Sequence, residues 1–427
     1  MKISELHSLF LECKGVSTDT RKISKQDMFF ALKGESFDGN TFTQQALNNG
    51  AKYIVIDDSN YTHIAQTILV NNVLKTLQEL ASFHRLYLKT TIIALTGSNG
   101  KTTTKELINA TLSQKYKTTA TIGNLNNHIG VPLTLLSMTK NTEIGIVEMG
   151  ANHLKEIAFL CNIAKPDYGY ITNFGKAHLE GFGSVEGVIK GKSEIYDFLI
   201  KNNKTIFVND HDPLQIEKSK GTKTYSFGNS TSNCDVTVNF IKAQPNVIVE
   251  YDNLSIKSHL IGDYNFNNIA AAIAIADYFK VKAKNIKMAI ENYIPNNNRS
   301  QVIIKSTNKI ILDAYNANPT SMKAALENFE KLNDKVKIAI LGDMFELGKD
   351  SGKEHQYLTD LASTMLLDKI ILIGSNFSKS KIVSPKIISF TTFEDFKLEF
   401  LGSTYQNTTF LVKGSRGMAM ERVLELL

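Results

Sequence analysis

Cysteine is scarce in this chain of 427 residues, where Cys13, Cys161 and Cys234 lie far apart. This spacing excludes a disulfide framework or a cysteine-based zinc site, and it fits a reducing compartment. Long apolar runs are also missing, because the most apolar stretch, Ile269–Ala276, is far shorter than the roughly 20 residues of a membrane span. The first residues show no basic segment followed by an apolar core, so no secretory signal is expected and the predicted location is the cytoplasm.

The chain also lacks a strong excess of one charge. Lys and Arg number 48 against 42 Asp and Glu, a net charge of +6 with no basic block. A dedicated nucleic-acid-binding protein would be more one-sided, so no nucleic-acid partner is expected. Apolar residues at 42% and charged residues at 21% are typical of a folded globular protein, which excludes a disordered chain or a fibre.

The length favours several domains, because a single core rarely grows past about 250–300 residues. We expect a small α/β domain at 1–85, a central domain at 86–297 and a C-terminal domain at 298–427. In the central domain, apolar runs of four to six residues alternate with helical segments and Gly-rich turns. This alternation predicts a parallel, doubly wound α/β sheet. A β-rich stretch from about Tyr225 to Leu260 and a helix at Asn265–Tyr278 follow, and the strand–helix pattern resumes after a polar hinge at Ile294–Ser300.

The segment TGSNGKTTTK, Thr96–Lys105, follows an apolar strand and opens a helix. Backbone N–H groups of such a turn surround phosphates, while Lys101 reaches the β- and γ-oxygens and the Thr102 hydroxyl can bind Mg²⁺. Leu95 replaces the first glycine of the strict P-loop pattern, but the strand–turn–helix context favours a phosphate site over an ordinary glycine turn. A second G-K-S, Gly191–Ser193, lies within a helical pattern and is not a candidate. The predicted nucleotide-binding residues here are Gly97, Ser98, Asn99, Gly100, Lys101, Thr102 and Thr103.

Two later strands end on polar residues that could lie close to this turn. Glu148 ends the strand IGIVE, and His178 follows the strand DYGYITN. In α/β sheets, ligands bind at the carboxyl ends of the strands. Mg²⁺ prefers oxygen ligands, so the histidine indicates a second, less purely oxygen-bound metal site. Either residue alone would more often be structural, and their expected nearness to the P-loop favours a metal-binding role.

These residues belong to a set of motifs that resembles the Mur ligases over nearly the whole chain. Two motifs, YNANP at 315–319 and LGDMFELG at 341–348, are typical of the member that adds a D-alanyl-D-alanine dipeptide, and the DNPR string of the diaminopimelate-adding member is absent. The other matching motifs are STDTR, LKGESFDGNTF, TGSNGKTTTK, GNLNNHIGVPLTLL, EMGANH, TNFGKAHLEGFGS, GDYNFNNIAAAIA, DAYNANPTSM and VKGSRGMAME.

The resemblance implies a uridine-nucleotide-binding N-terminal domain, an ATPase-like central domain and a Rossmann-like C-terminal domain. It also implies a reaction: ATP phosphorylates the carboxylate of UDP-N-acetylmuramoyl-tripeptide, and the amine of D-alanyl-D-alanine attacks the acyl phosphate. The implied cofactors are ATP and Mg²⁺, and a monomer is expected. Phosphoryl transfer needs charge neutralisation rather than a protein nucleophile, which agrees with the lack of a Ser/His/Asp or Cys/His constellation.

The resemblance assigns roles residue by residue. Thr102 and Glu148 would hold the metal on the ATP phosphates, and His178 the second metal. Asn268 would face adenine, although Tyr264 stands where the family commonly has His, and Arg299 and Asp313 would reach the nucleotide from the C-terminal side. Loop and cap chemistry is the alternative for many of these residues. The implied substrate-binding residues are Ser17, Arg21, Lys33, Gly34, Asn124, Asn126, Asn127, Tyr315, Asn316 and Asn318.

Lys192 stands where several Mur ligases carry a carbamylated lysine, whose new carboxylate helps to hold the second Mg²⁺. Capture of CO₂ needs a neutral amine, and a buried site with Lys101 and metals nearby would lower the lysine pKa. Lys190 competes for the role, and a solvated helix lysine is the structural alternative.

Three other functions compete with this interpretation. A ligase that adds diaminopimelate or lysine to UDP-MurNAc-dipeptide would share every ATP-site residue, and only the C-terminal motifs argue against it. A P-loop switch or motor protein is disfavoured because an N-K-x-D motif and a basic strip are missing. A binding module without catalysis is disfavoured because Lys101, Glu148 and His178 are intact.

Overall fold

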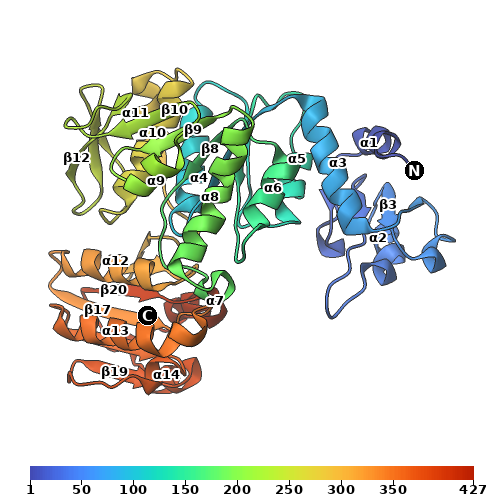
Figure 1. Ribbon diagram of the computed structural model, residues 1–427. Helices are drawn as coiled ribbons and strands as arrows, with labels where there is room; N and C mark the ends of the chain where they lie inside the picture. The colour runs from blue at the N-terminus through green and yellow to red at the C-terminus, as the bar shows by residue number, and fades with distance from the viewer.

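Three successive parts of the chain build separate main β-sheets in the computed structural model, which describes residues 1–427. In Figure 1 the N-terminal part is blue, the central part runs from light blue through green to yellow, and the C-terminal part is orange to red. The predicted three-domain α/β fold is confirmed. No helix combines the length and the apolar character needed to cross a membrane.

The N-terminal part is a four-stranded parallel sheet in the order β1-β2-β3-β4. The two inner strands are largely buried and carry aromatic and β-branched residues such as Phe29 and Ile54, which favour extended backbone. The elements are α1 (Ile3–Leu11), β1 (Val16–Ser17), β2 (Met28–Phe30), α2 (Thr43–Asn48), β3 (Tyr53–Ile56), β4 (Thr67–Leu69) and α3 (Val73–Leu88).

The central sheet has seven parallel strands in the order β11-β10-β9-β8-β5-β7-β6. Its elements are β5 (Thr91–Thr96), α4 (Lys101–Leu112), β6 (Thr118–Ala120), α5 (Gly130–Leu136), β7 (Ile144–Glu148), α6 (Glu156–Ala164), β8 (Tyr168–Ile171), α7 (Leu179–Phe182), α8 (Val185–Lys201), β9 (Thr205–Asn209), α9 (Pro213–Lys218), β10 (Thr224–Gly228) and β11 (Val236–Thr237). The second G-K-S sequence, at 191–193, lies inside α8, as the helical pattern predicts.

The β-rich stretch divides between two sheets, which the sequence pattern does not foresee. β10 and β11 extend the central sheet, whereas β12 (Asn239–Lys242), β13 (Ile248–Tyr251) and β14 (Leu254–Lys257) form an antiparallel sheet of their own. Helix α10 (Asn265–Tyr278) coincides with the predicted helix and packs against α4, β9 and β10. The last central helix is α11 (Ala283–Asn292).

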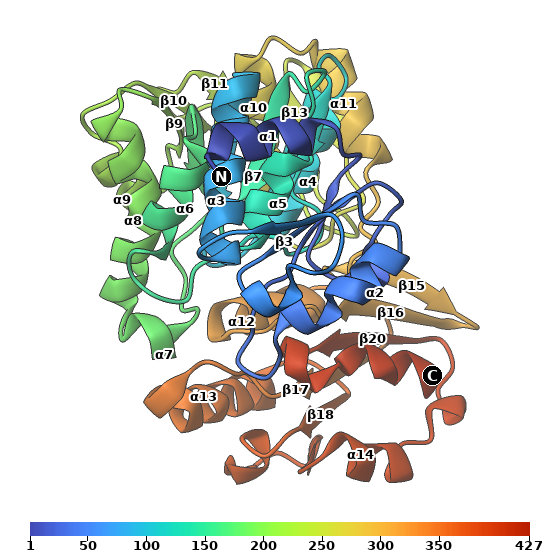
Figure 2. The same ribbon diagram turned by 90° about the vertical axis from the view of Figure 1, so that its right-hand side faces the viewer.

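The C-terminal sheet has the order β15-β16-β20-β17-β18-β19, parallel except for the β15–β16 hairpin. Its elements are β15 (Gln301–Lys305), β16 (Asn308–Asp313), α12 (Pro319–Glu330), β17 (Val336–Gly342), α13 (Ser351–Thr364), β18 (Lys369–Ile373), β19 (Ile387–Phe390), α14 (Phe393–Glu399) and β20 (Thr408–Lys413). In both views α12 lies on the side of this sheet that faces the central part (Figures 1 and 2).

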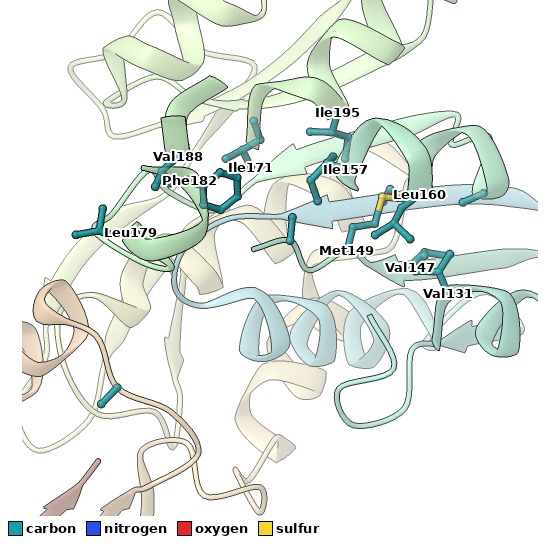
Figure 3. Close-up of a cluster of buried hydrophobic side chains, with 14 of the residues drawn as sticks. Val131, Val147, Met149, Ile157, Leu160, Ile171, Leu179, Phe182, Val188 and Ile195 are labelled. Carbon is teal, nitrogen blue, oxygen red and sulfur yellow. The ribbon is translucent and has the colours of Figure 1, made fainter. Parts of the chain in front are cut away.

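The core of the central part lies on both faces of the sheet, against α4, α10 and α11 on one face and against α6 and α8 on the other. Figure 3 shows Val147 and Ile171, on β7 and β8, close to Ile157 and Ile195 on α6 and α8. Each is fully buried, and burial of such a side chain contributes about 1.5–3 kcal/mol. This packing holds the carboxyl ends of β7 and β8 at the edge where Glu148 and His178 follow.

The expected domain boundaries stay predictions. Residue 85 lies within α3, which packs against α1 on one side and against α5 and α6 on the other. The helix therefore belongs to the contact between the N-terminal and central parts.

Two buried histidines tie α1 to the rest of the protein. His7 Nε2 lies 2.9 Å from His84 Nδ1 on α3, and His84 Nε2 lies 3.0 Å from the Met138 carbonyl oxygen. Burial, and secondarily the charge of His84, lowers the pKa of His7 from 6.5 to about 4. The unfolded chain therefore takes up this proton near pH 6.5, whereas the folded chain does so only near pH 4.

Acidification should accordingly weaken the packing of α1. Between the two pKa values the unfolded state binds more protons, so stability falls as the pH falls, by about 2 kcal/mol between pH 7 and pH 5 for His7 alone. Thermal unfolding of wild type and His7→Asn at both pH values measures this. The wild-type midpoint should drop further than that of the variant, and equal drops would contradict the role of His7.

Candidate functional site

A cavity of about 600 Å³ opens between the central and C-terminal parts. Its wall combines the turn after β5, the carboxyl ends of β7 and β8, the start of α10 and the segment around β16 and α12. The sequence-predicted residues that line it are Ser98, Asn99, Gly100, Lys101, Thr102, Thr103, Asn124, Asn126, Asn127, Glu148, His178, Asn268, Arg299, Asp313, Tyr315, Asn316 and Asn318.

The turn between β5 and α4 depends on two glycines. Gly97 has φ +146° and Gly100 has φ +79°, both in the region that favours glycine. A Cβ at Gly97 would lie 2.0 Å from Thr172 Oγ1, and one at Gly100 would lie 2.5 Å from Asn268 Oδ1. Gly97 does not line the cavity, and its role is to let the chain turn. The helix then starts at Lys101, so its N-terminal N–H groups lie beside the cavity, where an anion can bind.

Lys101 folds back over its own turn. Its Nζ donates to the Gly97 carbonyl oxygen at 2.7 Å and to that of Ser98 at 3.5 Å. Burial lowers the lysine pKa, with the Glu148 carboxylate opposing this shift and Arg299 adding to it. The Lys101 side chain lies at the N-terminus of α4, on the wall of the cavity.

Thr102 and Glu148 present two buried oxygen atoms without hydrogen-bond partners, Oγ1 and Oε2. Glu148 is 1% exposed, and its other oxygen accepts from Asn126 Nδ2 at 2.8 Å. A buried oxygen without a hydrogen-bond partner lowers the stability of the fold unless a ligand interacts with it. Two such oxygens fit Mg²⁺, although no cluster of three or more His, Cys, Asp or Glu side chains is present. Any ion here would need further ligands from water or phosphate.

His178 precedes α7 and contacts the C-terminal part. Its Nδ1 lies 2.5 Å from Glu346 Oε2, and the N–H is not aimed straight at that oxygen. This contact lowers the pKa of Glu346. The sequence motif LGDMFELG contains Glu346, but nothing in the motif indicates its partner.

Lys192 is fully buried behind the cavity wall and is not one of the lining residues. Its Nζ donates to the carbonyl oxygen of Ala151, which does line the cavity, at 3.1 Å and lies 5.2 Å from the centre of the Phe182 ring. Burial, and then the charge of Lys101, lowers the pKa of Lys192 well below its usual value. Lys190 is exposed, so it does not fit the same role.

The wall beside the turn after β5 combines α10 with the C-terminal part. Asn268 Oδ1 accepts from Thr104 Oγ1 at 3.0 Å, which holds the amide against the turn. Tyr264 bonds Ser300 at 2.9 Å, and the Arg299 guanidinium stacks 3.7 Å from the centre of the Tyr315 ring. The two parts also meet directly, because Asn318 Nδ2 donates to Asn99 Oδ1 at 2.7 Å.

Sequence reasoning missed several lining residues, of which Lys413 is the most informative. Lys413 is 2% exposed, and its Nζ lies 2.5 Å from Asp313 Oδ2. The available signal was a lysine at the end of the apolar strand TTFLVK. The other lining residues with polar side chains and no assignment are His128, Asn152, Glu156, Asn173, Tyr264, Asn265, Ser300, Thr320 and Ser321.

The four predicted substrate residues of the N-terminal part do not line this cavity. They lie at the carboxyl ends of β1 and β2 or in the turns that follow, where Arg21 pairs with Asp19 at 2.9 Å and Lys33 with Asp57 at 3.0 Å. Ser17 Oγ donates to the Asp19 carbonyl oxygen at 2.9 Å, and a Cβ at Gly34 would meet the Phe37 ring at 2.3 Å. Their local sheet places them in a separate region.

The chain belongs to the Mur ligase family. The family's catalytic domain matches residues 12–90, its middle domain residues 95–276, and the domain described as the Mur ligase glutamate ligase domain residues 298–416.

Relatives within this family match along almost the whole length. The chain is 34% identical to the UDP-N-acetylmuramoyl-tripeptide–D-alanyl-D-alanine ligase of Bacillus subtilis, covering 96% of this chain and 92% of the relative. It is 33% identical to the Escherichia coli enzyme of the same name, with coverages of 99% and 95%. A crystal structure of MurF from Acinetobacter baumannii superposes with a TM-score of 0.87 at 32% identity, covering 99% and 98%. MurF from Thermotoga maritima in complex with ADP gives a TM-score of 0.82 at 29% identity, covering 98% and 97%.

Proposed function

We propose that this protein is the ATP-dependent ligase that joins D-alanyl-D-alanine to UDP-N-acetylmuramoyl-tripeptide in the synthesis of peptidoglycan precursors. The full-length similarity to ligases of that name carries the proposal. The cavity supports it, because the glycine-rich turn after β5 and the YNANP segment line the same cavity. Since the reaction consumes ATP, the proposed compartment is the cytoplasm, and the monomeric state stays a prediction.

The chemistry follows from the arrangement of charges. A carboxylate oxygen of the tripeptide attacks the γ-phosphorus of ATP, the bond to the β-phosphate oxygen breaks, and ADP leaves. The dipeptide amine then attacks the acyl carbon, loses a proton and expels inorganic phosphate, which leaves an amide bond. In the first step Lys101 and the N–H groups at the start of α4 stabilise the charge that spreads over the transferred phosphoryl group.

Thr102 and Glu148 are the proposed ligands of Mg²⁺ on the ATP phosphates, and His178 and a carbamylated Lys192 those of a second ion. Bound Mg²⁺ would neutralise phosphate charge and orient the reacting oxygens. The orphaned Thr102 and Glu148 oxygens support the first site. Asn126 holds the Glu148 carboxylate in place by its hydrogen bond.

The remaining roles divide among the three proposed domains. Residues 1–85 would bind the uridine nucleotide through Ser17, Arg21, Lys33 and Gly34. Asn124 and Asn127 in the central domain, 86–297, lie on the substrate side of the cavity, and Asn268 faces adenine. From the C-terminal domain, 298–427, Arg299 and Asp313 reach the nucleotide, while Tyr315, Asn316 and Asn318 lie beside the incoming dipeptide.

One assay tests the proposal directly. Purified protein with ATP, Mg²⁺ and UDP-N-acetylmuramoyl-tripeptide should release phosphate when D-alanyl-D-alanine is added. Free diaminopimelate or lysine should give no release, with either the tripeptide or the dipeptide nucleotide as acceptor. The tripeptide is supplied in both its diaminopimelate and lysine forms. Turnover of the dipeptide nucleotide with a free amino acid would instead assign the chain to the neighbouring ligase.

A further inference from the structure

The loop that follows β17 carries the motif LGDMFELG, for which the reaction above gives no role. This loop reaches across to the central part, where Glu346 Oε2 lies 2.5 Å from His178 Nδ1. A second contact lies beside it, because the Glu180 backbone N–H donates to the Glu346 carbonyl oxygen at 3.2 Å. In both views α7, which His178 precedes, lies next to the C-terminal part (Figures 1 and 2).

Buried polar side chains hold this loop rigidly. The Met344 N–H donates to His355 Nε2 at 3.0 Å, and the Phe345 N–H donates to Ser415 Oγ at 2.8 Å. Both acceptor residues are almost fully buried. Glu346 itself is only half-buried, so its position is set by the loop and not by packing of its own side chain.

Both partners of the contact have a left-handed backbone. Glu346 has φ +61° and His178 has φ +53°, a region in which residues with side chains are uncommon. Such conformations cost about 1–3 kcal/mol each and persist only where the surroundings enforce them, often at functional sites. The two strained positions face each other across the boundary between the parts.

The contact with Glu346 affects which nitrogen of the His178 ring carries the proton. His178 Nδ1 is buried against the carboxylate, whereas 19% of the side chain remains exposed, so the exposed atoms belong to the rest of the ring. A carboxylate beside Nδ1 favours the tautomer that carries its proton there, which leaves the lone pair on Nε2. Metal-binding histidines commonly have such a carboxylate partner on their other nitrogen.

We propose that Glu346 is a positioning residue for the second metal site: its carboxylate lies against Nδ1 of His178, favours the proton on that nitrogen and thereby keeps Nε2 available as a ligand. This inference rests on the proposed function, because it takes His178 as a metal ligand. Since Glu346 belongs to the C-terminal part, the metal site is complete only when that part is docked on α7. Domain docking and assembly of the reaction site are thus one event.

The arrangement also links the docking contact to Lys192. Helix α7 follows His178 directly, and its Phe182 side chain is buried beside Val188 and Ile171 in the central core (Figure 3). Lys192 Nζ lies 5.2 Å from the Phe182 ring. A shift of His178 would therefore move the wall that encloses the other proposed ligand of the same ion.

The test compares three variants with wild type: Glu346→Ala, Glu346→Gln and Glu354→Gln. Glu354 is the matched control, because its carboxylate also reaches the central part, 2.7 Å from Lys176 Nζ, but has no contact with a proposed ligand. Binding of Mn²⁺ is measured by electron paramagnetic resonance with ADP and the tripeptide nucleotide present, and the Mg²⁺ dependence of phosphate release is measured alongside.

Glu346→Ala should weaken the binding of the second Mn²⁺ about 10-fold. It should also raise the Mg²⁺ concentration that gives the half-maximal rate by a similar factor. Glu346→Gln keeps an oxygen acceptor and should recover most of the affinity. Glu354→Gln should bind Mn²⁺ like wild type. In metal-free protein, the ¹⁵N chemical shifts of His178 should indicate the Nδ1–H tautomer, and Glu346→Ala should reduce its population.

Two results would overturn the proposal while the metal assignment stands. In the first, Glu346→Ala retains full Mn²⁺ affinity although His178→Ala loses the second ion. In the second, Glu354→Gln weakens Mn²⁺ binding as much as Glu346→Ala does. The effect would then belong to docking of the C-terminal part on the central part in general. If His178→Ala itself retains both ions, the assignment and the proposal both fail. The proposed function is tested separately: it is wrong if wild type releases no phosphate when the dipeptide is added.

Discussion

Replacement of Lys101 by alanine is expected to lower kcat by roughly 10²-fold or more, because it removes a principal positive charge from the phosphoryl-transfer step. The ammonium lies at the N-terminus of α4 on the cavity wall. Its hydrogen bonds go to carbonyl oxygens of its own turn, so truncation breaks no hydrogen bond to a carboxylate. The fold should therefore persist, and steady-state phosphate release at saturating substrates measures the loss.

Two comparisons make the Lys101 result specific. Binding of the uridine nucleotide should stay nearly unchanged, because its proposed site lies in the N-terminal part, away from the cavity. Lys101→Arg keeps the charge and should retain more activity than Lys101→Ala, although the planar guanidinium is not equivalent to an ammonium. Near-normal turnover of Lys101→Ala would contradict the assignment of the phosphate site.

Local sequence patterns are enough to predict the parts of the site that lie at the ends of strands. The turn after β5 needs only its glycines and the apolar strand before it to be recognised. Glu148 ends one buried strand and His178 follows another, and the carboxyl ends of these strands meet at one edge. Their placement on the cavity wall could therefore be predicted from the order of strands and helices.

Contacts between the parts could not be predicted in the same way. Asp313 and Lys413 pair because β16 and β20 are neighbours in the C-terminal sheet, although 100 residues separate them. Glu346 meets His178 only because two separately folded parts dock, and no periodicity in either segment encodes the distance. The same limit applies to β12–β14, whose alternating residues indicate strands but not the sheet that they join.

Replacement of Lys192, a proposed ligand of the second Mg²⁺, is the other substitution expected to lower activity strongly. Lys192→Ala should lower kcat by roughly 10²-fold or more, because the second Mg²⁺ would lose an anionic ligand. The side chain is fully buried, and burial lowers its pKa, which favours the neutral amine that carbamate formation requires. The amine nitrogen attacks the carbon of CO₂, and the resulting carbamic acid loses a proton. Lys190→Ala is the matched control, since its exposed side chain lies on the same helix and should be dispensable.

Loss of activity alone does not separate a carbamate from a lysine that contacts phosphate as a cation, so the nature of the rescue decides. A small carboxylate such as acetate could occupy the space left in Lys192→Ala and restore part of the rate if the lost group was an anionic ligand. A small amine would do so if the lost group was a cation. ¹³C NMR of wild type supplied with ¹³CO₂ should also show a carbamate signal that is missing from Lys192→Ala. Rescue by an amine without rescue by a carboxylate, together with no such signal, would exclude the carbamate and leave His178 without its anionic partner at the second ion.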